Sequence, residues 1–120
     1  MKNKKSRQRK WVREEVVILV TEYYKNKNLS AEEIDKSYYK ISEFLRKREK
    51  ICTGKPVEDI FRNYAGIRMQ TARIRCLDSD SNLNGMKATK LQKEIVNEFL
   101  QNPSIIYDEA ETIYKKYEHI

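Results

Sequence analysis

The sequence predicts an all-α fold, a compact bundle of about five helices. The first three helices are expected to have helix-turn-helix character, and the last two to form a C-terminal helical pair. Only three glycines and two prolines punctuate the 120 residues, too few for a many-turned β fold. Apolar residues recur at helical spacing between these breaks. A chain of this length forms one domain whose core needs no disulfide or metal.

Two helices are expected in the first half of the chain. The first spans about residues 12–25 and carries its apolar face on Val12, Val16, Leu19, Val20 and Tyr23. Ser30 and Glu33 then form a capping box that opens the second helix. Its apolar stripe is Ile34, Tyr38, Ile41 and Leu45. We expect a break near Ser37, a charged end at residues 46–50, and a loop over residues 51–60.

The third helix is expected from Tyr64 to about Leu77, with Asn63 as its N-cap. Ile67 and Ile74 project to one side, and Met69 and Cys76 project roughly to the opposite side. This pattern predicts a helix packed on two sides with arginines at its edges. Arg68 and Arg75 share one face, and Gln70 and Arg73 lie across from them.

A polar, turn-rich segment over residues 78–87 separates the third helix from the last two. It lacks the spacing, central glycine and closing glutamate of a calcium loop, so we expect no metal there. The fourth helix is expected over about residues 89–101, with Leu91, Ile95 and Phe99 on its apolar face. Asn102 and Pro103 then start a fifth helix that runs to about Tyr117.

Positive charge is segregated along the chain, and the formal net charge is +7. Residues 1–10 carry six basic and no acidic groups, and residues 46–75 carry nine basic and three acidic groups. The two remaining stretches are mildly acidic. Segregation of this kind is typical of a protein that binds a polyanion, and nucleic acid is the expected partner. We divide the chain into a flexible basic arm (1–10) and a single helical DNA-binding domain (11–120).

The sequence offers little catalytic chemistry, so the chain is not expected to be an enzyme or to need a cofactor. Its one histidine, His119, is the penultimate residue, and no Walker-type loop or zinc-ligand spacing occurs. Cys52 and Cys76 are expected to be reduced thiols of a cytoplasmic protein. The longest apolar run, residues 16–20, is too short to span a bilayer, and no membrane partner is expected.

Three ordered motifs resemble a known family. They are Lys10-Trp11-Val12-Arg13-Glu14-Glu15, Ile41-Ser42-Glu43-Phe44-Leu45, and the segment that begins Phe61-Arg62-Asn63-Tyr64-Ala65-Gly66-Ile67 and continues to Asp78. Together they are similar to the helical N-terminal module of McrA-like, modification-dependent HNH endonucleases. The first motif also resembles the opening of Myb/SANT-like helix-turn-helix domains, although Val12 stands where a capping serine or threonine is usual.

The resemblance covers about residues 7–80 and implies DNA recognition in a restriction, defence or mobile-element system. The family's nuclease half needs paired histidines and an asparagine, which the single His119 cannot supply. Gln70 and Thr71 also replace a lysine and an apolar residue that are common in the family. The chain therefore resembles the recognition module alone, with cleavage expected from a nuclease or other protein partner.

Duplex-DNA binding is the favoured function, and three groups of residues are the predicted contacts. The arm supplies Lys4, Lys5, Arg7, Arg9 and Lys10; the end of the second helix supplies Arg46 and Arg48; and the third-helix segment supplies Arg62, Asn63, Arg68, Gln70, Arg73 and Arg75. One alternative is a small regulator or inhibitor that docks on a protein through the tyrosine-rich, acidic C-terminal helices. Another is binding of single strands or RNA by stacking on Tyr24, Tyr39 and Tyr64.

Overall fold

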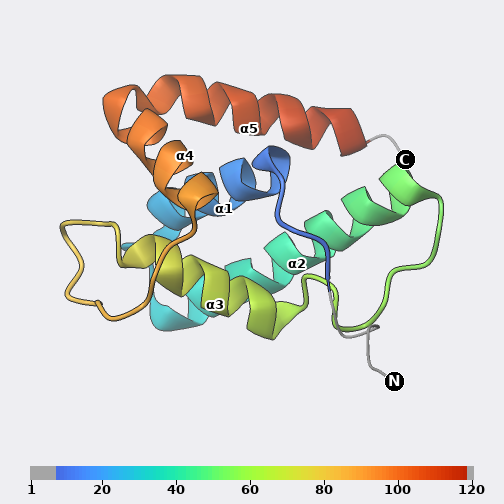
Figure 1. Cartoon of the computed structure of the whole chain (residues 1–120), viewed down its shortest axis with the longest axis horizontal. Coiled ribbons are helices and arrows are strands. Elements are labelled where there is room, and N and C mark those ends of the chain that lie inside the picture. The colour runs from blue at the N-terminus through green and yellow to red at the C-terminus, as the bar shows by residue number, and fades with distance from the viewer. Residues whose placement is uncertain (1–7, 119–120) are drawn as a thin grey trace.

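The computed structural model describes residues 8–118 and confirms an all-helical bundle (Figure 1). No strand occurs within this range. The five helices are α1 (Arg13–Asn26), α2 (Ala31–Thr53), α3 (Tyr64–Arg75), α4 (Lys90–Gln101) and α5 (Pro103–Glu118). None of them is long and apolar enough to cross a membrane.

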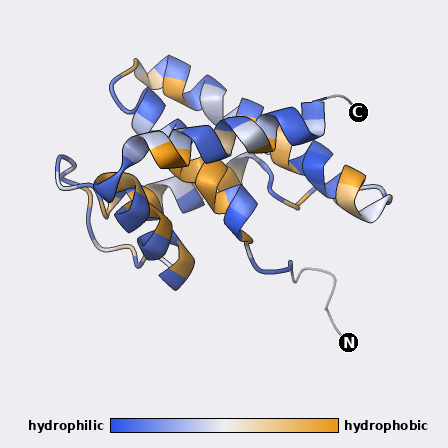
Figure 2. Ribbon diagram, turned by 90° about the horizontal axis from the view of Figure 1, so that it is seen from above, coloured by the Kyte–Doolittle hydropathy of each residue, from blue (hydrophilic) through white to orange (hydrophobic). Residues whose placement is uncertain are grey.

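Helix α1 is the centre of the bundle, because it contacts each of the other four helices. Residues 15–21 are all buried, including the charged Glu15. The single apolar face predicted for this helix is therefore too narrow. The other four helices surround α1, and its run of apolar residues contributes to the core on all sides of the helix. Figure 2 shows the hydrophobic residues concentrated in the middle of the bundle.

Helix α2 continues without a break from Ala31 to Thr53, so the expected interruption near Ser37 is wrong. The Ser37 hydroxyl donates to the Ile34 carbonyl at 2.6 Å, which satisfies it inside the helix. The predicted loop at residue 51 also starts too early. The helix ends where Gly54, at φ 70°, adopts the left-handed conformation and donates its N–H to the Lys50 carbonyl.

Helix α3 begins as predicted, because the Asn63 side chain accepts from the Gly66 N–H at 2.9 Å. Its buried face consists of Ile67, Thr71 and Ile74. The opposite side is exposed, with Met69 at 49 % exposure, so the prediction of packing on two sides is wrong. Residues 54–63 join α2 to α3, a longer link than the roughly three- to four-residue turn of a standard helix-turn-helix motif.

Helices α4 and α5 form the predicted C-terminal pair and both pack on α1. Thr89 and Gln92 form a capping box at the start of α4, in which each side chain accepts from the other's backbone N–H. Pro103 is the first residue of α5, where its missing N–H costs no helical hydrogen bond. These local signals place both helices within a residue of the predicted bounds.

Candidate nucleic-acid interface

The outward side of α3 forms a narrow crest of small and flexible residues. Ala65, Met69, Ala72 and Cys76 follow one another at helical spacing, opposite the buried Ile67. Two of the four crest positions are alanine, so the helix backbone can approach a flat or concave partner closely. We call these four residues the α3 crest.

Arg68 and Arg75 line the edge of the α3 crest that faces α2. Both are exposed, and both guanidinium groups lie near the phenol of Tyr38 on α2. Burial raises the pKa of Tyr38, and the two arginine charges act in the opposite direction. Arg75 donates from Nε to the Ser81 hydroxyl at 3.2 Å, whereas Arg68 has no hydrogen-bond partner among residues 8–118. These two arginines are thus available to a ligand.

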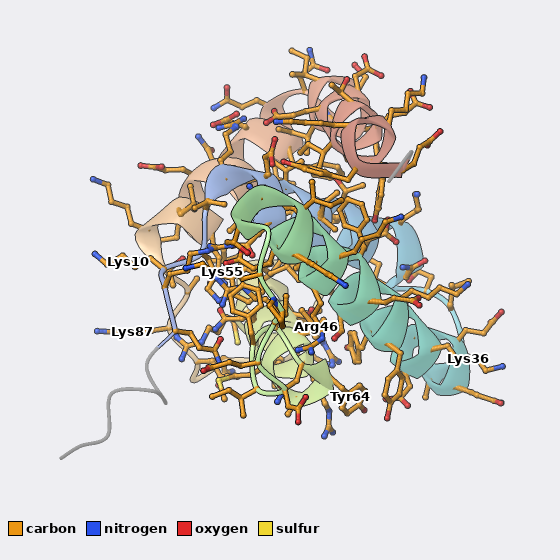
Figure 3. The ribbon with its side chains drawn as sticks, turned by 90° about the vertical axis from the view of Figure 1, so that its right-hand side faces the viewer. Lys10, Lys36, Arg46, Lys55, Tyr64 and Lys87 are labelled. Carbon is orange, nitrogen blue, oxygen red and sulfur yellow. The ribbon has the colours of Figure 1, made fainter. Side chains whose placement is uncertain are left out.

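The other edge of α3 is held by neighbouring segments. Arg73 donates from Nη1 to the Lys87 carbonyl at 2.6 Å, and Gln70 accepts from the Gln92 side chain at 2.7 Å. These contacts connect α3 to the loop that precedes α4 and to α4 itself. The amine of Lys87 extends outward, and Figure 3 shows Lys10 and Lys87 projecting on the same side of the molecule. Gln70 and Arg73 therefore each have a structural partner within the described chain.

Arg62, predicted to bind phosphate, is buried instead. Only 2 % of the residue is exposed, and its Nε and Nη2 atoms bond both oxygens of the buried Glu15 carboxylate at 2.9 and 3.1 Å. Its guanidinium lies 4.0 Å from the Trp11 ring centroid and 4.2 Å from that of Phe61. A phosphate could reach this group only if the core opened, so the predicted contact is wrong.

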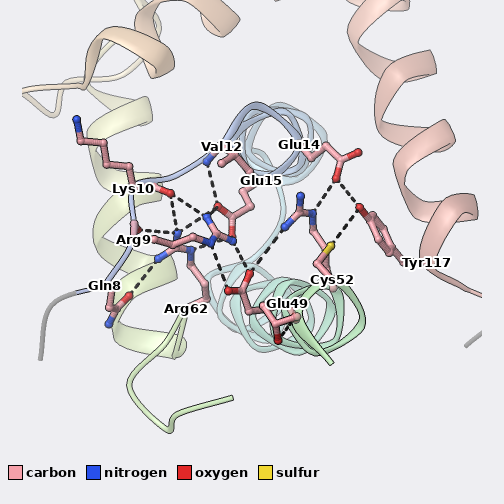
Figure 4. A network of polar contacts seen from close by, with 12 residues as sticks. Gln8, Arg9, Lys10, Val12, Glu14, Glu15, Glu49, Cys52, Arg62 and Tyr117 are labelled. Atoms are coloured by element: carbon pink, nitrogen blue, oxygen red, sulfur yellow. Dashed lines mark hydrogen bonds and ion pairs between the residues drawn. The ribbon is translucent and has the colours of Figure 1, made fainter. Parts of the chain in front are cut away.

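The residues around Arg62 also bind residues 8–10, the end of the basic arm (Figure 4). Arg62 donates to the Gln8 side chain at 3.0 Å and to the Arg9 carbonyl at 3.2 Å. Arg9 in turn forms ion pairs with Glu15 at 2.9 Å and with Glu49 at 2.6 Å. Residues 8–10 are therefore docked on the bundle, and Arg9 neutralises internal carboxylates in place of DNA. Hydrogen bonds from Arg9 and Arg62 outweigh burial and lower the pKa of Glu15.

The two arginines predicted near the end of α2 are also engaged inside the protein. Arg46 donates to the carbonyls of Glu58 and Phe61, each at 2.7 Å, and so holds the loop that leads to α3. Arg48 bonds Glu14 at 2.8 Å and lies over the Tyr117 ring. Burial alone would raise the pKa of Glu14, but hydrogen bonds from Tyr117, Arg48 and Lys116 lower it to about 2. Arg46 and Arg48, both predicted DNA contacts, are thus engaged in intramolecular contacts.

The remaining predicted contacts divide into three cases. Asn63 uses its side-chain oxygen to cap α3. The Lys10 side chain is exposed, and its amine has no partner among residues 8–118. Lys4, Lys5 and Arg7 lie outside the described residues.

The tyrosines proposed as stacking platforms differ in their accessibility. Tyr24 stacks on Phe99 with ring centroids 4.3 Å apart, which makes it part of the core packing. Tyr39 and Tyr64 stack on each other at 4.4 Å near the start of α3, and Tyr39 is 57 % exposed. Tyr64 also donates to Asp35 on α2, which raises its pKa. Of the three tyrosines proposed as stacking platforms, Tyr39 and Tyr64 lie beside the α3 crest.

The tyrosines of α5 point inward, which bears on the predicted protein-docking surface. Tyr117 is 4 % exposed and donates to Glu14 at 2.7 Å, and Tyr114 donates to Glu22 at 2.9 Å. Tyr107 packs edge-on against Phe99. These phenols join α5 to the rest of the bundle and do not form an outer face.

Sequence reasoning missed which basic residues are neutralised by the protein itself. A signal was present for Arg62, since Trp11 and Phe61 are large aromatic residues that need a partner surface. A signal was also present for Glu15, the third residue of a helix whose cap position, Val12, has no polar side chain. The Glu15 carboxylate accepts from the Val12 N–H at 3.1 Å.

No known protein family, curated protein or solved structure matches the chain. The candidate interface therefore rests on the geometry of α3 and on the charges that remain free around it.

Proposed function

We propose that the chain is a duplex-DNA-binding module that presents the α3 crest to a groove. The observation that carries the proposal is the pair of exposed arginines, Arg68 and Arg75, along the edge of a helix whose outermost residues are small. Arg46, Arg48 and Arg62 bind internal groups, which leaves Arg68 and Arg75 as the two arginines of residues 46–75 that bond no carboxylate or carbonyl in the described chain.

The chemistry of this surface suits a nucleic-acid groove. A helix fits the major groove of B-DNA, and small crest residues let its backbone come near the base edges. Met69 and the two crest alanines are suited to apolar contact with thymine methyl groups. Arg68 and Arg75 offer planar donors for phosphate or guanine. Lys10 and Lys87 add charge that is independent of DNA sequence.

Because several arginines pair inside the protein, the affinity for DNA should depend less on salt than the net charge of the chain would suggest. If Lys10, Arg68, Arg75 and Lys87 neutralise about four phosphates, affinity should fall roughly 100-fold between about 50 and 200 mM salt. Six contacts would give a fall of about three orders of magnitude. The slope of affinity against salt concentration therefore reports how many basic groups that are not paired inside the protein contact phosphates.

A salt-titrated fluorescence anisotropy assay tests the proposal on duplex DNA, single-stranded DNA and RNA of one sequence. Arg68→Ala and Arg75→Ala should each weaken duplex binding about tenfold and leave the thermal unfolding midpoint within about 2 °C. Lys36→Ala is the control variant. Lys36 is also an exposed cation, and Figure 3 shows it on the opposite side of the molecule from Lys10 and Lys87. Its effect should be less than twofold.

Two outcomes would contradict duplex binding through α3. Equal losses in Arg68→Ala and Lys36→Ala would mean that general charge, and not the α3 edge, attracts the nucleic acid. Tighter binding of single strands, lost on Tyr39→Ala, would instead assign the function to the Tyr39–Tyr64 pair.

We further propose that the module serves a restriction, defence or mobile-element system in which another protein supplies cleavage. This follows from the resemblance of the three sequence motifs, and it is tested by cleavage assays on bound duplexes with Mg²⁺ or Mn²⁺. The chain alone should leave the DNA intact. Cleavage that survives rigorous purification would overturn this part of the proposal.

A further inference from the structure

A pocket of about 140 Å³ opens between α1, α2 and α3, on the α2 side of the α3 crest. Its wall includes the aromatic rings of Tyr23 and Tyr38, the aliphatic side chains of Ile34 and Ile41, the buried Thr71, and Arg75. Sites between the helices of a bundle are common places for small ligands. The chain thus has a pocket whose wall shares no residue with the α3 crest.

The volume and the wall chemistry restrict what could occupy this pocket. A cavity of about 150 Å³ lined by apolar side chains accommodates one benzene ring. The pocket of about 140 Å³ therefore suits a single six-membered ring with a small substituent. Tyrosine and isoleucine side chains supply the apolar contact that such a ring needs.

The charges around the pocket select the substituent. Glu22 forms an ion pair with Lys25 at 3.6 Å and accepts from Tyr114 at 2.9 Å. Lys27 is held by Asp78 at 2.6 Å and Asp80 at 3.2 Å. The terminal nitrogens of Arg75 have no acceptor among residues 8–118. Arg75 is therefore the one pocket charge in the described chain that lacks an opposite charge, and it favours an anion.

Two hydroxyl groups near Arg75 can add hydrogen bonds. The Tyr38 phenol lies close to the Arg75 charge and has no hydrogen-bond partner within residues 8–118. Thr71 is 5 % exposed, and its hydroxyl is one of the few buried polar atoms without a partner in the described chain. Threonine in a helix populates two rotamers, so this hydroxyl can change its hydrogen-bond partner when a ligand binds.

We propose that this pocket binds a small aromatic or heteroaromatic carboxylate. The ring lies against Tyr23, Tyr38 and the isoleucines, and the carboxylate accepts hydrogen bonds from Arg75 and the Tyr38 hydroxyl. The proposal does not depend on nucleic-acid binding, since every group that it uses belongs to the pocket.

Titration of the ¹⁵N-labelled full chain with benzoate, followed by amide chemical shifts, tests the proposal. Benzoate should give saturable shifts at Tyr38, Thr71 and Arg75. Benzylamine has the same ring with the opposite charge, and acetate has the carboxylate without the ring. Each of these should bind at least tenfold more weakly, because each lacks one of the two recognised features.

Variants of α3 supply the decisive comparison. Arg75→Gln should weaken benzoate binding at least tenfold, the scale of one charged hydrogen bond. Arg68→Gln removes the same charge one heptad earlier on α3, outside the pocket wall although near Tyr38, and should weaken binding less than twofold. Shifts that do not saturate, equal binding of benzylamine, or equal losses in the two variants would overturn the proposal.

Discussion

Arg62 joins three segments that are far apart in the sequence. Its guanidinium lies between Trp11 and Phe61 and pairs with Glu15, and its carbonyl accepts from the Ser42 hydroxyl at 2.7 Å. These residues belong to the three motifs that carry the family resemblance. Arg62 also has a φ of 46°, an uncommon value for a residue with a side chain. The cluster thus holds a strained backbone in place, which gives the motifs a structural reason to occur together.

Replacement of Arg62 should therefore unfold or strongly destabilise the protein. Arg62→Ala leaves the Glu15 carboxylate buried with one fewer partner, so the free energy of unfolding should fall by about 3–5 kcal/mol. Urea denaturation followed by circular dichroism measures the change. The exposed Arg68→Ala should change it by less than about 0.5 kcal/mol. A small loss for Arg62→Ala would mean that Arg9 alone can satisfy Glu15.

Thr71 offers a prediction of the opposite sign. Its buried hydroxyl has no partner in the described chain, and Thr71→Val removes that oxygen while preserving the shape of the side chain. The free energy of unfolding should rise by about 1 kcal/mol, since an unpaired buried hydroxyl is costly. Thr112→Val is the control, because the Thr112 hydroxyl donates to the Asp108 carbonyl at 3.1 Å. Stabilisation by both variants would point to a general effect of valine.

At the scale of elements, the loop between α2 and α3 is held by a side chain from α2. Arg46 bonds the carbonyls of Glu58, Asp59 and Phe61, which otherwise lack helical or strand partners. This arrangement sets where α3 begins, and so it also orients the α3 crest. Arg46 therefore stabilises the long link between α2 and α3, which has no short turn to set its conformation.

Arg46→Met should loosen this loop without unfolding the helices. Hydrogen exchange of the Phe61 amide, which donates to the Glu58 carbonyl at 3.0 Å, should accelerate at least tenfold, because the carbonyls of this turn lose a charged donor. Lys47→Met is the matched control: Lys47 is the adjacent exposed residue of α2 and should leave the exchange rates unchanged. Unchanged exchange in Arg46→Met would show that the backbone of the loop is rigid on its own.

At the scale of the whole molecule, several carboxylates hold the helices together through ion pairs. Glu14 on α1 contacts Arg48 on α2 and Lys116 on α5, and its pKa is about 2 against an ordinary value of 4.5. The pKa of Asp78 is also lowered: burial opposes this shift, but hydrogen bonds from Lys27 and Tyr23 outweigh it. Charged carboxylates therefore contribute to the association of distant helices.

Stability should consequently fall in acid. A carboxyl whose folded pKa lies below its unfolded value stabilises the fold fully above about pH 4.5, and this contribution disappears as the pH drops towards 2. Urea unfolding between pH 7 and pH 2 should show this decline. Glu14→Gln should be less stable than the parent chain at pH 7, with the difference shrinking towards pH 2. A constant difference would show that the Glu14 charge is not involved.

The sequence by itself determined the number of helices and most of their ends. Ser30, Asn63, Thr89 and Pro103 act on backbone groups within a few residues, so their effect is readable locally. The charged run at residues 46–50 resembles a helix end, but α2 extends beyond it because Gly54 provides the C-cap.

Only the tertiary structure decided which basic residues face solvent. Arg62 finds Glu15 across 47 positions of sequence, and Arg9 finds Glu49 across 40. Composition counts both arginines as free surface charge, yet Arg62 is buried against its carboxylate and the exposed Arg9 is paired with two carboxylates. Arg68 and Arg75 stay free because α3 turns its isoleucines, and not its arginines, towards α1. The candidate interface therefore depends on how α3 packs against the bundle as well as on its sequence.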